Sequence, residues 1–131
     1  MHEAIGEPPV VLIVDDDIPI TEILALVIEG LGYQPVVAWN GHQALTLARK
    51  HWPALVLTDM MMPILGGKEV VKGLHEEAGA RGMAPPPIVL LTAGTIWPEI
   101  ASLVDAIISK PFEMDELEQL IYRFLPPSAS W

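Results

Sequence analysis

Four short apolar runs constrain the fold of this chain more than any other feature of its sequence. The runs occupy residues 10–14, 54–57, 88–91 and 104–108, and they are rich in Leu or in β-branched residues. Short runs without polar alternation are typical of strands that are buried on both faces of a sheet. A fifth candidate, residues 34–38, follows a Gly-Leu-Gly helix stop, and we expect an edge strand there.

Segments with helical periodicity separate these runs. Their apolar residues recur at spacings of three and four, which indicates amphipathic helices. The stripes comprise Ile20, Ile23, Leu24, Val27, Ile28 and Leu31; Ala44, Leu45, Leu47 and Ala48; Val70, Val71 and Leu74; and Leu117, Leu120, Ile121 and Phe124. Residues 93–102 leave room for one or two turns, so we expect a short fourth helix. Five alternations of strand and helix favour a parallel sheet with helices on both faces.

The composition suits one compact domain. Of the 131 residues, 51% are hydrophobic and 18% are charged, which is enough for a generous buried core. We expect the domain to span residues 10–125. The Pro-containing ends, 1–9 and 126–131, are predicted to be a flexible N-terminal segment and a C-terminal tail.

Charge and cysteine content exclude several classes of function. The formal net charge of -10 would repel a polyanion, so we expect no direct nucleic-acid binding. Cys is absent, which removes disulfides and thiolate metal sites, and residues 1–9 do not resemble a secretion signal. The longest uncharged stretch, 82–98, contains several Pro residues and falls short of the roughly 20 apolar residues of a membrane span. We expect a cytoplasmic protein without membrane contact.

Polar residues follow the central apolar runs at the point where each run ends. They are Asp15, Asp16 and Asp17 after the first run, Asp59 after the second, Thr92 after the third, and Lys110 after the fourth. In an open parallel sheet the ligand site lies beyond the carboxyl ends of the strands, so these groups should converge. Taken singly, each acid would be an ordinary turn or helix-capping residue, and we expect that role for Asp17.

Converging carboxylates need a cation. Two carboxylates about 4 Å apart repel by roughly 4 kcal/mol at an effective dielectric constant near 20. Hard oxygen ligands without His or Cys favour Mg²⁺, which readily shares its coordination shell with a phosphoryl group. An ionised Asp59 could attack phosphorus without a general base, and Lys110 and the Thr92 hydroxyl are suited to hold phosphoryl oxygens.

Four ordered motifs resemble the receiver domain of two-component response regulators. They are Val11-Leu-Ile-Val-Asp-Asp-Asp17, Leu57-Thr-Asp59-Met-Met-Met-Pro63, Leu90-Leu-Thr92-Ala93 and Ser109-Lys110-Pro111-Phe112. The resemblance covers residues 10–125 and implies a flavodoxin-like, doubly wound sheet of five parallel strands in the order 2-1-3-4-5.

The resemblance also implies roles for individual residues. Asp59 would be the phosphoacceptor, with a histidine kinase or a histidine phosphotransfer protein as donor. Mg²⁺ would be bound by Asp15, Asp16, Asp59 and the backbone carbonyl of Met61, and the phosphoryl group by Thr92, Ala93 and Lys110. The bond before Pro111 is expected to be cis.

Two departures from the family pattern affect the expected output. Ile107 stands three residues before Lys110, where the family usually carries an aromatic switch residue, so coupling through an aromatic ring is not expected. Thr92 and Lys110 are 18 positions apart (110 minus 92), fewer than is usual in the family. The missing residues would shorten the fourth helix and reshape the output face.

We therefore expect a stand-alone receiver that signals by conformational change or by passing the phosphoryl group on. Beyond self-phosphorylation and slow autodephosphorylation it should not act as an enzyme; it should be a monomer or weak dimer with an unknown downstream protein. Two alternatives stay open. A receiver-like adaptor that binds a partner constitutively would suit Ile107 and the short fourth helix. An aspartyl-phosphate phosphatase that uses Mg²⁺ would place a second Asp where Met61 stands.

Overall fold

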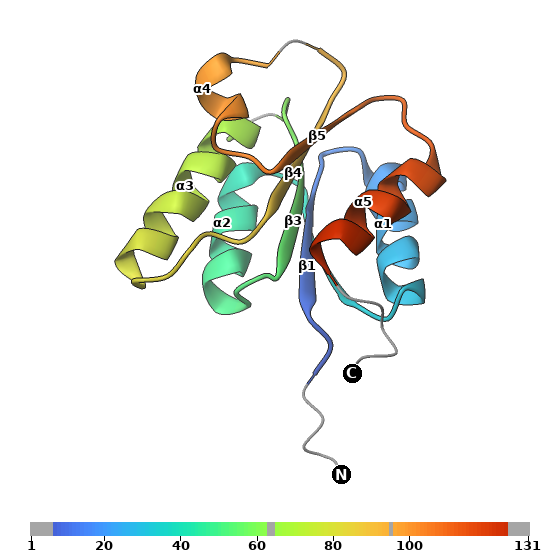
Figure 1. The fold of residues 1–131 in the computed structure, drawn as a ribbon, viewed down its shortest axis with the longest axis horizontal. Coiled ribbons are helices and arrows are strands. Elements are labelled where there is room, and N and C mark those ends of the chain that lie inside the picture. Colours follow the sequence, from blue (N-terminus) through green and yellow to red (C-terminus); the bar gives the residue numbers. More distant parts are fainter. Residues whose placement is uncertain (1–6, 63–64, 95, 126–131) are drawn as a thin grey trace.

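The computed structural model describes residues 7–62, 65–94 and 96–125. The strands are β1 (Val10–Val14), β2 (Gln34–Ala38), β3 (Leu55–Asp59), β4 (Ile88–Thr92) and β5 (Ala106–Ser109). The helices are α1 (Ile18–Gly30), α2 (Gly41–Lys50), α3 (Gly67–Ala80), α4 (Pro98–Ala101) and α5 (Met114–Phe124). All strand pairs are parallel and the sheet order is β2-β1-β3-β4-β5 (Figure 1), which confirms the predicted doubly wound fold.

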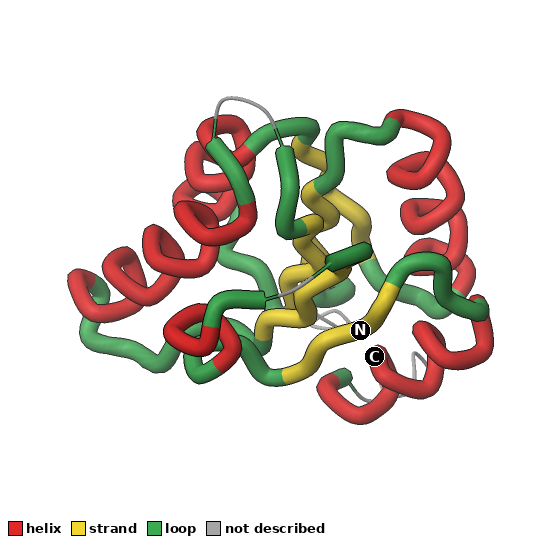
Figure 2. Tube along the Cα trace, turned by 90° about the horizontal axis from the view of Figure 1, so that it is seen from above, coloured by secondary structure: helices red, strands yellow, loops and turns green. Residues whose placement is uncertain are grey.

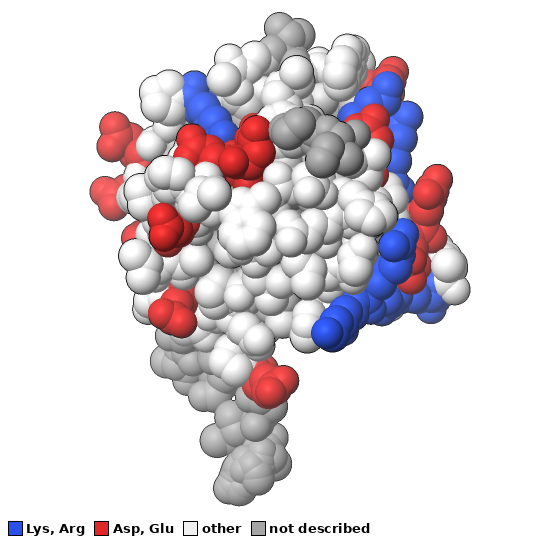
Figure 3. Space-filling model, turned by 180° about the vertical axis from the view of Figure 1, so that it is seen from behind, with Lys and Arg blue, Asp and Glu red and all other residues white. Residues whose placement is uncertain are grey.

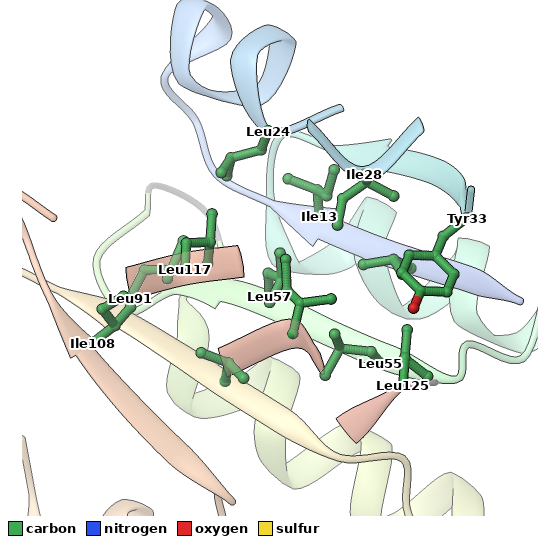
Figure 4. Packing of buried hydrophobic residues seen from close by; sticks show 13 residues of the cluster. Ile13, Leu24, Ile28, Tyr33, Leu55, Leu57, Leu91, Ile108, Leu117 and Leu125 are labelled. Atoms are coloured by element: carbon green, nitrogen blue, oxygen red, sulfur yellow. The ribbon is translucent and has the colours of Figure 1, made fainter. Parts of the chain in front are cut away.

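The sheet lies between two layers of helices, as the view from above shows (Figure 2). Side chains of a strand point alternately to its two faces, so each central strand contributes to two cores. On one face, Ile13 and Leu57 pack with residues of α1 and α5 (Figure 4). On the other face, Leu12 and Leu90 pack with residues of α2, α3 and α4. The strand ends are therefore held from both sides.

The turn after β1 is fixed by the start of α1. Asp17 is the N-cap residue, and its carboxylate accepts a hydrogen bond from the backbone N–H of Ile20 at 3.2 Å. Pro19 lies in the first turn, where its missing N–H costs nothing. The capping role predicted for Asp17 is confirmed. Its carboxylate is used to cap α1, unlike those of Asp15 and Asp16, which belong to the acid cluster.

The structure corrects the prediction for the strand at 104–108. β5 covers Ala106–Ser109 and lies at an edge of the sheet, so it is not buried on both faces. The side chain of Ile107 is 43% exposed. The predicted short fourth helix is confirmed, because α4 has only 4 residues. The second predicted run is also shifted: β3 begins at Leu55 and continues through Asp59.

Candidate functional site

Parallel strands deliver the predicted polar residues to one edge of the sheet. Asp59 and Thr92 are the last residues of β3 and β4, whereas Asp15 follows β1 and Lys110 follows β5. The register aligns these ends, since Asp59 is opposite Leu91 on β4 and Thr92 is opposite Ser109 on β5. The convergence expected from the sequence is present in the structure.

Three carboxylates form a cluster at this edge. One oxygen from each of Asp15, Asp16 and Asp59 can be chosen so that all lie within 4.8 Å of one another. Asp15 is fully buried, Asp59 is 8% exposed, and Asp16 is exposed. Several carboxylate oxygens at this spacing, open to solvent on one side, fit a hard divalent cation that keeps part of its water shell.

Lys110 supplies the positive charge that faces this cluster. Its Nζ lies 2.8 Å from Oδ2 of Asp15 and 3.4 Å from Oδ1 of Asp59. Its backbone N–H donates to the carbonyl oxygen of Thr92 at 2.7 Å, which ties the end of β5 to the end of β4. The Lys110–Pro111 peptide bond is cis, as predicted.

The other basic side chains lie mostly elsewhere. On the face shown in Figure 3, Lys and Arg gather mainly along one side of the molecule. This is the side of α2 and α3, and five of the seven basic residues belong to it: Arg49, Lys50, Lys68, Lys72 and Arg81. Among the described ion pairs, Lys110 is the one cation paired with the clustered acids.

The pKa values of the site reflect burial and this pairing. Burial, followed by the charge of Asp15, raises the pKa of Asp59 above its ordinary value, and Lys110 offsets only part of that rise. Burial also acts to lower the pKa of Lys110, but its hydrogen bond and charge interaction with Asp15, with a further contribution from Asp59, raise it overall. Burial and the neighbouring Asp15 thus both disfavour the charged form of Asp59, and Lys110 favours it.

Thr92 ends β4 and Ala93 begins the loop that follows it. The Thr92 side chain is buried, and its hydroxyl accepts from the backbone N–H of Gly94 at 3.1 Å and lies 3.3 Å from the carbonyl oxygen of Gly94. Ala93 is exposed beside it. In this conformation the hydrogen bonds of the Thr92 hydroxyl are made with Gly94, two residues further along the chain.

Met61 lies in the loop after Asp59, with its side chain 72% exposed. Because this side chain lies in solvent, the predicted role of Met61 in metal binding would involve its backbone carbonyl alone. Ile107 lies outside the cluster, on the open edge of the sheet. Of the predicted residues, the structure thus brings together the three acids and Lys110, and places Thr92 on the adjoining strand end.

One close contact at the site was not predicted. Gly67, the first residue of α3, lies so near β3 that a Cβ there would collide with the carbonyl oxygen of Asp59. Its backbone N–H donates to the carbonyl oxygen of Met60 at 3.0 Å. The Gly66-Gly67 pair at the start of a helix was the available signal, since paired glycines often permit close backbone approach.

Comparisons with known proteins agree with this geometry. The sequence model of the response regulator receiver domain matches residues 11–122. DNA-binding response regulator MtrA of Mycolicibacterium paratuberculosis is 39% identical over 111 residues, which cover 82% of this chain and 47% of that protein. This chain thus spans about half the length of the curated relatives it matches.

Solved structures are similar over nearly the whole chain. Chemotaxis protein CheY4 of Vibrio cholerae is 28% identical with a TM-score of 0.77, and the match covers 90% of this chain and 99% of that one. Response regulator protein TrrA of Thermotoga maritima, solved in complex with Mg(2+)-BeF, is also 28% identical with a TM-score of 0.77, covering 89% and 99%. No described helix is both long and apolar enough to cross a membrane.

Proposed function

Because the chain belongs to the response regulator receiver domain family, we propose that it accepts a phosphoryl group on Asp59 and acts as a phosphorylation switch. One observation carries the proposal: Lys110 contacts both Asp15 and Asp59 inside a cluster of three acids. Phosphoryl transfer requires mainly positioning and charge neutralisation, and this cluster is arranged for both.

The transfer would use a phosphohistidine of a histidine kinase or a histidine phosphotransfer protein. An Asp59 oxygen forms a bond to phosphorus while the donor's P–N bond breaks, and the electron pair stays on the imidazole nitrogen. Lys110, the Thr92 hydroxyl and the backbone of Ala93 would hold the oxygens of the transferred group. Lys110 then exchanges its contact with Asp59 for one with the phosphoryl group.

The acids have the donor chemistry that Mg²⁺ prefers. Asp15, Asp16 and Asp59 would hold the ion, together with the backbone carbonyl of Met61. A bound Mg²⁺ would neutralise charge on the acids and on the incoming phosphoryl group. The Mg²⁺–BeF complex of the similar TrrA supports this assignment.

The site supports a switch rather than a turnover enzyme. A phosphatase of the haloacid-dehalogenase type needs a general acid two residues after the nucleophile, and Met61 occupies that position here. The Thr92 hydroxyl and Lys110 provide groups that respond to a phosphoryl group. A conformational change at these residues, or onward transfer of the phosphoryl group, would be the output.

An apolar cavity next to Lys110 offers a place for the donor. It has a volume of about 410 Å³ and lies between α1 and the segment that begins α5. Its lining includes Ile20, Ile23 and Leu24 on one side and Phe112 and Met114 on the other. We place the donor protein along this side of α1, where apolar contacts would hold its phosphohistidine near Asp59.

Acetyl phosphate with Mg²⁺ tests the proposal. The intact mass of the protein should rise by one phosphoryl group, and Asp59→Asn or excess EDTA should prevent the rise. Asp17→Asn is the matched control, because Asp17 follows the same strand but caps α1. The proposal fails if the wild-type mass stays unchanged, or if Asp59→Asn is labelled as fully as the control.

A further inference from the structure

A lysine on α3 contacts two residues at the start of α4. The Nζ of Lys68 lies 5.1 Å from the centre of the Trp97 ring and 3.7 Å from Oε1 of Glu99. These three residues, called here the Lys68 clasp, join the first turn of α3 to the start of α4. Trp97 and Glu99 flank Pro98, so Lys68 contacts the chain on both sides of the first residue of α4.

The clasp also borders the loop that follows Asp59. Lys68 and Trp97 line one cavity of about 270 Å³ together with Met60, Met61 and Met62. The residues that directly follow Asp59 and the residue that precedes α4 thus border the same cavity at the clasp. A displacement of the residues after Asp59 would therefore alter the packing around Trp97 through these side chains.

The clasp matters because α4 is too short to hold itself. Helices of a single turn are not stable without tertiary contacts, and α4 has 4 residues. Its buried contact is Ile100, which packs in the core. The Trp97 carbonyl accepts backbone N–H bonds from Ile100 and Ala101, so the position of Trp97 also sets that of the helix.

We propose that Lys68 is a positioning residue that holds Trp97 and the start of α4 in the conformation in which the Thr92 hydroxyl is bonded to Gly94. This inference rests on the proposed phosphorylation of Asp59. In the described conformation the Thr92 hydroxyl is bonded to Gly94, and the clasp is closed. In the proposed switch, Thr92 exchanges its bonds with Gly94 for a contact with the phosphoryl group, and we infer that the clasp, which anchors the same connection at Trp97 and Glu99, opposes that exchange.

The direction of the effect follows from the location of these contacts. A ligand shifts an equilibrium only by binding one conformation better than the other. The clasp stabilises the conformation that binds the phosphoryl group less well, so removing the clasp favours the other one. A partly exposed cation–π contact plus an exposed ion pair correspond to a change in affinity of roughly three- to tenfold.

Beryllofluoride, a phosphoryl analogue, provides the test. Its apparent dissociation constant at saturating Mg²⁺ would be measured by calorimetry for the wild type, Lys68→Met, Lys68→Arg and Lys72→Met. Lys68→Met keeps the apolar stem and loses the charge, so it should bind beryllofluoride roughly three- to tenfold more tightly. Lys68→Arg keeps a cation over the ring and should match the wild type. Lys72→Met, an exposed lysine on the same helix, is the control.

Mg²⁺ alone should bind equally to all four proteins, which separates the clasp from a general loosening of the acid cluster. Glu99→Gln, which removes only the ion pair, should have a smaller effect in the same direction and serves if Lys68→Met does not fold. Beryllofluoride affinity that is unchanged or weakened in Lys68→Met and Glu99→Gln overturns the clasp proposal. If the wild type does not bind beryllofluoride, or Asp59→Asn binds it equally well, the proposed function is what has failed.

Discussion

The two halves of the sheet differ in how firmly they are held. β1 and β3, which end at the acids, are covered on both faces, and their helices α1 and α3 have 13 and 14 residues. Beyond β4 the cover becomes thin: α4 has 4 residues and β5 alternates between buried and exposed positions. We call the region of β1 and β3 the firm half and the region beyond β4 the thin half. The acids proposed to bind a cation lie in the firm half, Thr92 ends β4 at the boundary, and Lys110 follows the edge strand β5 in the thin half.

This difference fits a site that must bind and respond. In the proposed function the acids would have to keep their spacing to hold a cation, which requires a well-packed support. Elements that move are drawn from regions with few buried contacts. The contrast is therefore a physical claim about local stability, and paired substitutions can test it.

The largest difference in the free energy of unfolding should be between substitutions at two neighbouring positions on β4 and β5. Leu90 on β4 and Ile107 on β5 are register partners, but Leu90 is fully buried and Ile107 is half-exposed. Leu90→Ala should lower the free energy of unfolding by about 3 to 4 kcal/mol through lost burial and a cavity. Ile107→Ala should lower it by less than about 1 kcal/mol.

Urea unfolding at two protein concentrations measures both values. A cost for Ile107→Ala as large as that for Leu90→Ala would break the comparison. If that cost also depended on protein concentration, a second copy would be covering the edge of β5.

A pair of glycines provides the second contrast. A Cβ at Gly67 meets the backbone of Asp59, whereas a Cβ at Gly94 meets nothing within 4 Å. Gly67→Ala should cost about 2 to 3 kcal/mol, because backbone on the firm half cannot move aside. Gly94→Ala should change stability by less than about 0.5 kcal/mol. Equal thermal shifts for the two variants would contradict the difference between the halves.

The firm half could be predicted well from the sequence. Unbroken apolar runs identify buried strands, and parallel connection places the residues at their ends at one edge, which was sufficient to bring Asp15, Asp59 and Thr92 together. The end of the fourth run also located Lys110, although that strand lies at the edge of the sheet. The same reasoning assigned too much burial to the strand around Ile107. Its run resembles the central ones in composition, whereas its exposure depends on strand order and on the length of the neighbouring helix.

Contacts between distant segments could not be predicted in this way. Lys68 and Trp97 are far apart in the sequence, and no periodicity relates them. Their contact depends on how the loops after β3 and β4 fold beside each other. For Gly67 the Gly66-Gly67 pair was a signal of close backbone approach, but which backbone passes so near it depends on the folded structure.

The third prediction concerns the cation that bridges the halves. Lys110→Met leaves the fully buried Asp15 without the cation that lies 2.8 Å away. The loss should be roughly 2 kcal/mol, below that of a fully buried pair, because Lys110 is itself partly exposed. Denaturation of Asp15→Asn, Lys110→Met and the double variant gives the coupling between them. If the two losses simply add, the pair does not hold the halves together.

The smallest effect should come from Asp59 itself, and it has the opposite sign. Burial and Asp15 raise the pKa of Asp59 in the folded protein, so its charged form opposes folding when no metal is bound. Metal-free Asp59→Asn should therefore unfold at a slightly higher temperature than the wild type at neutral pH. The difference should vanish as the pH falls below the ordinary range of an aspartate, should grow as the pH rises from that range toward the raised folded-state pKa, and should level off above it. Asp115→Asn, an exposed acid in the first turn of α5, should show no such rise. A gain for Asp59→Asn that did not change with pH would mean that the firm half tolerates the charge, and that the benefit comes from packing instead.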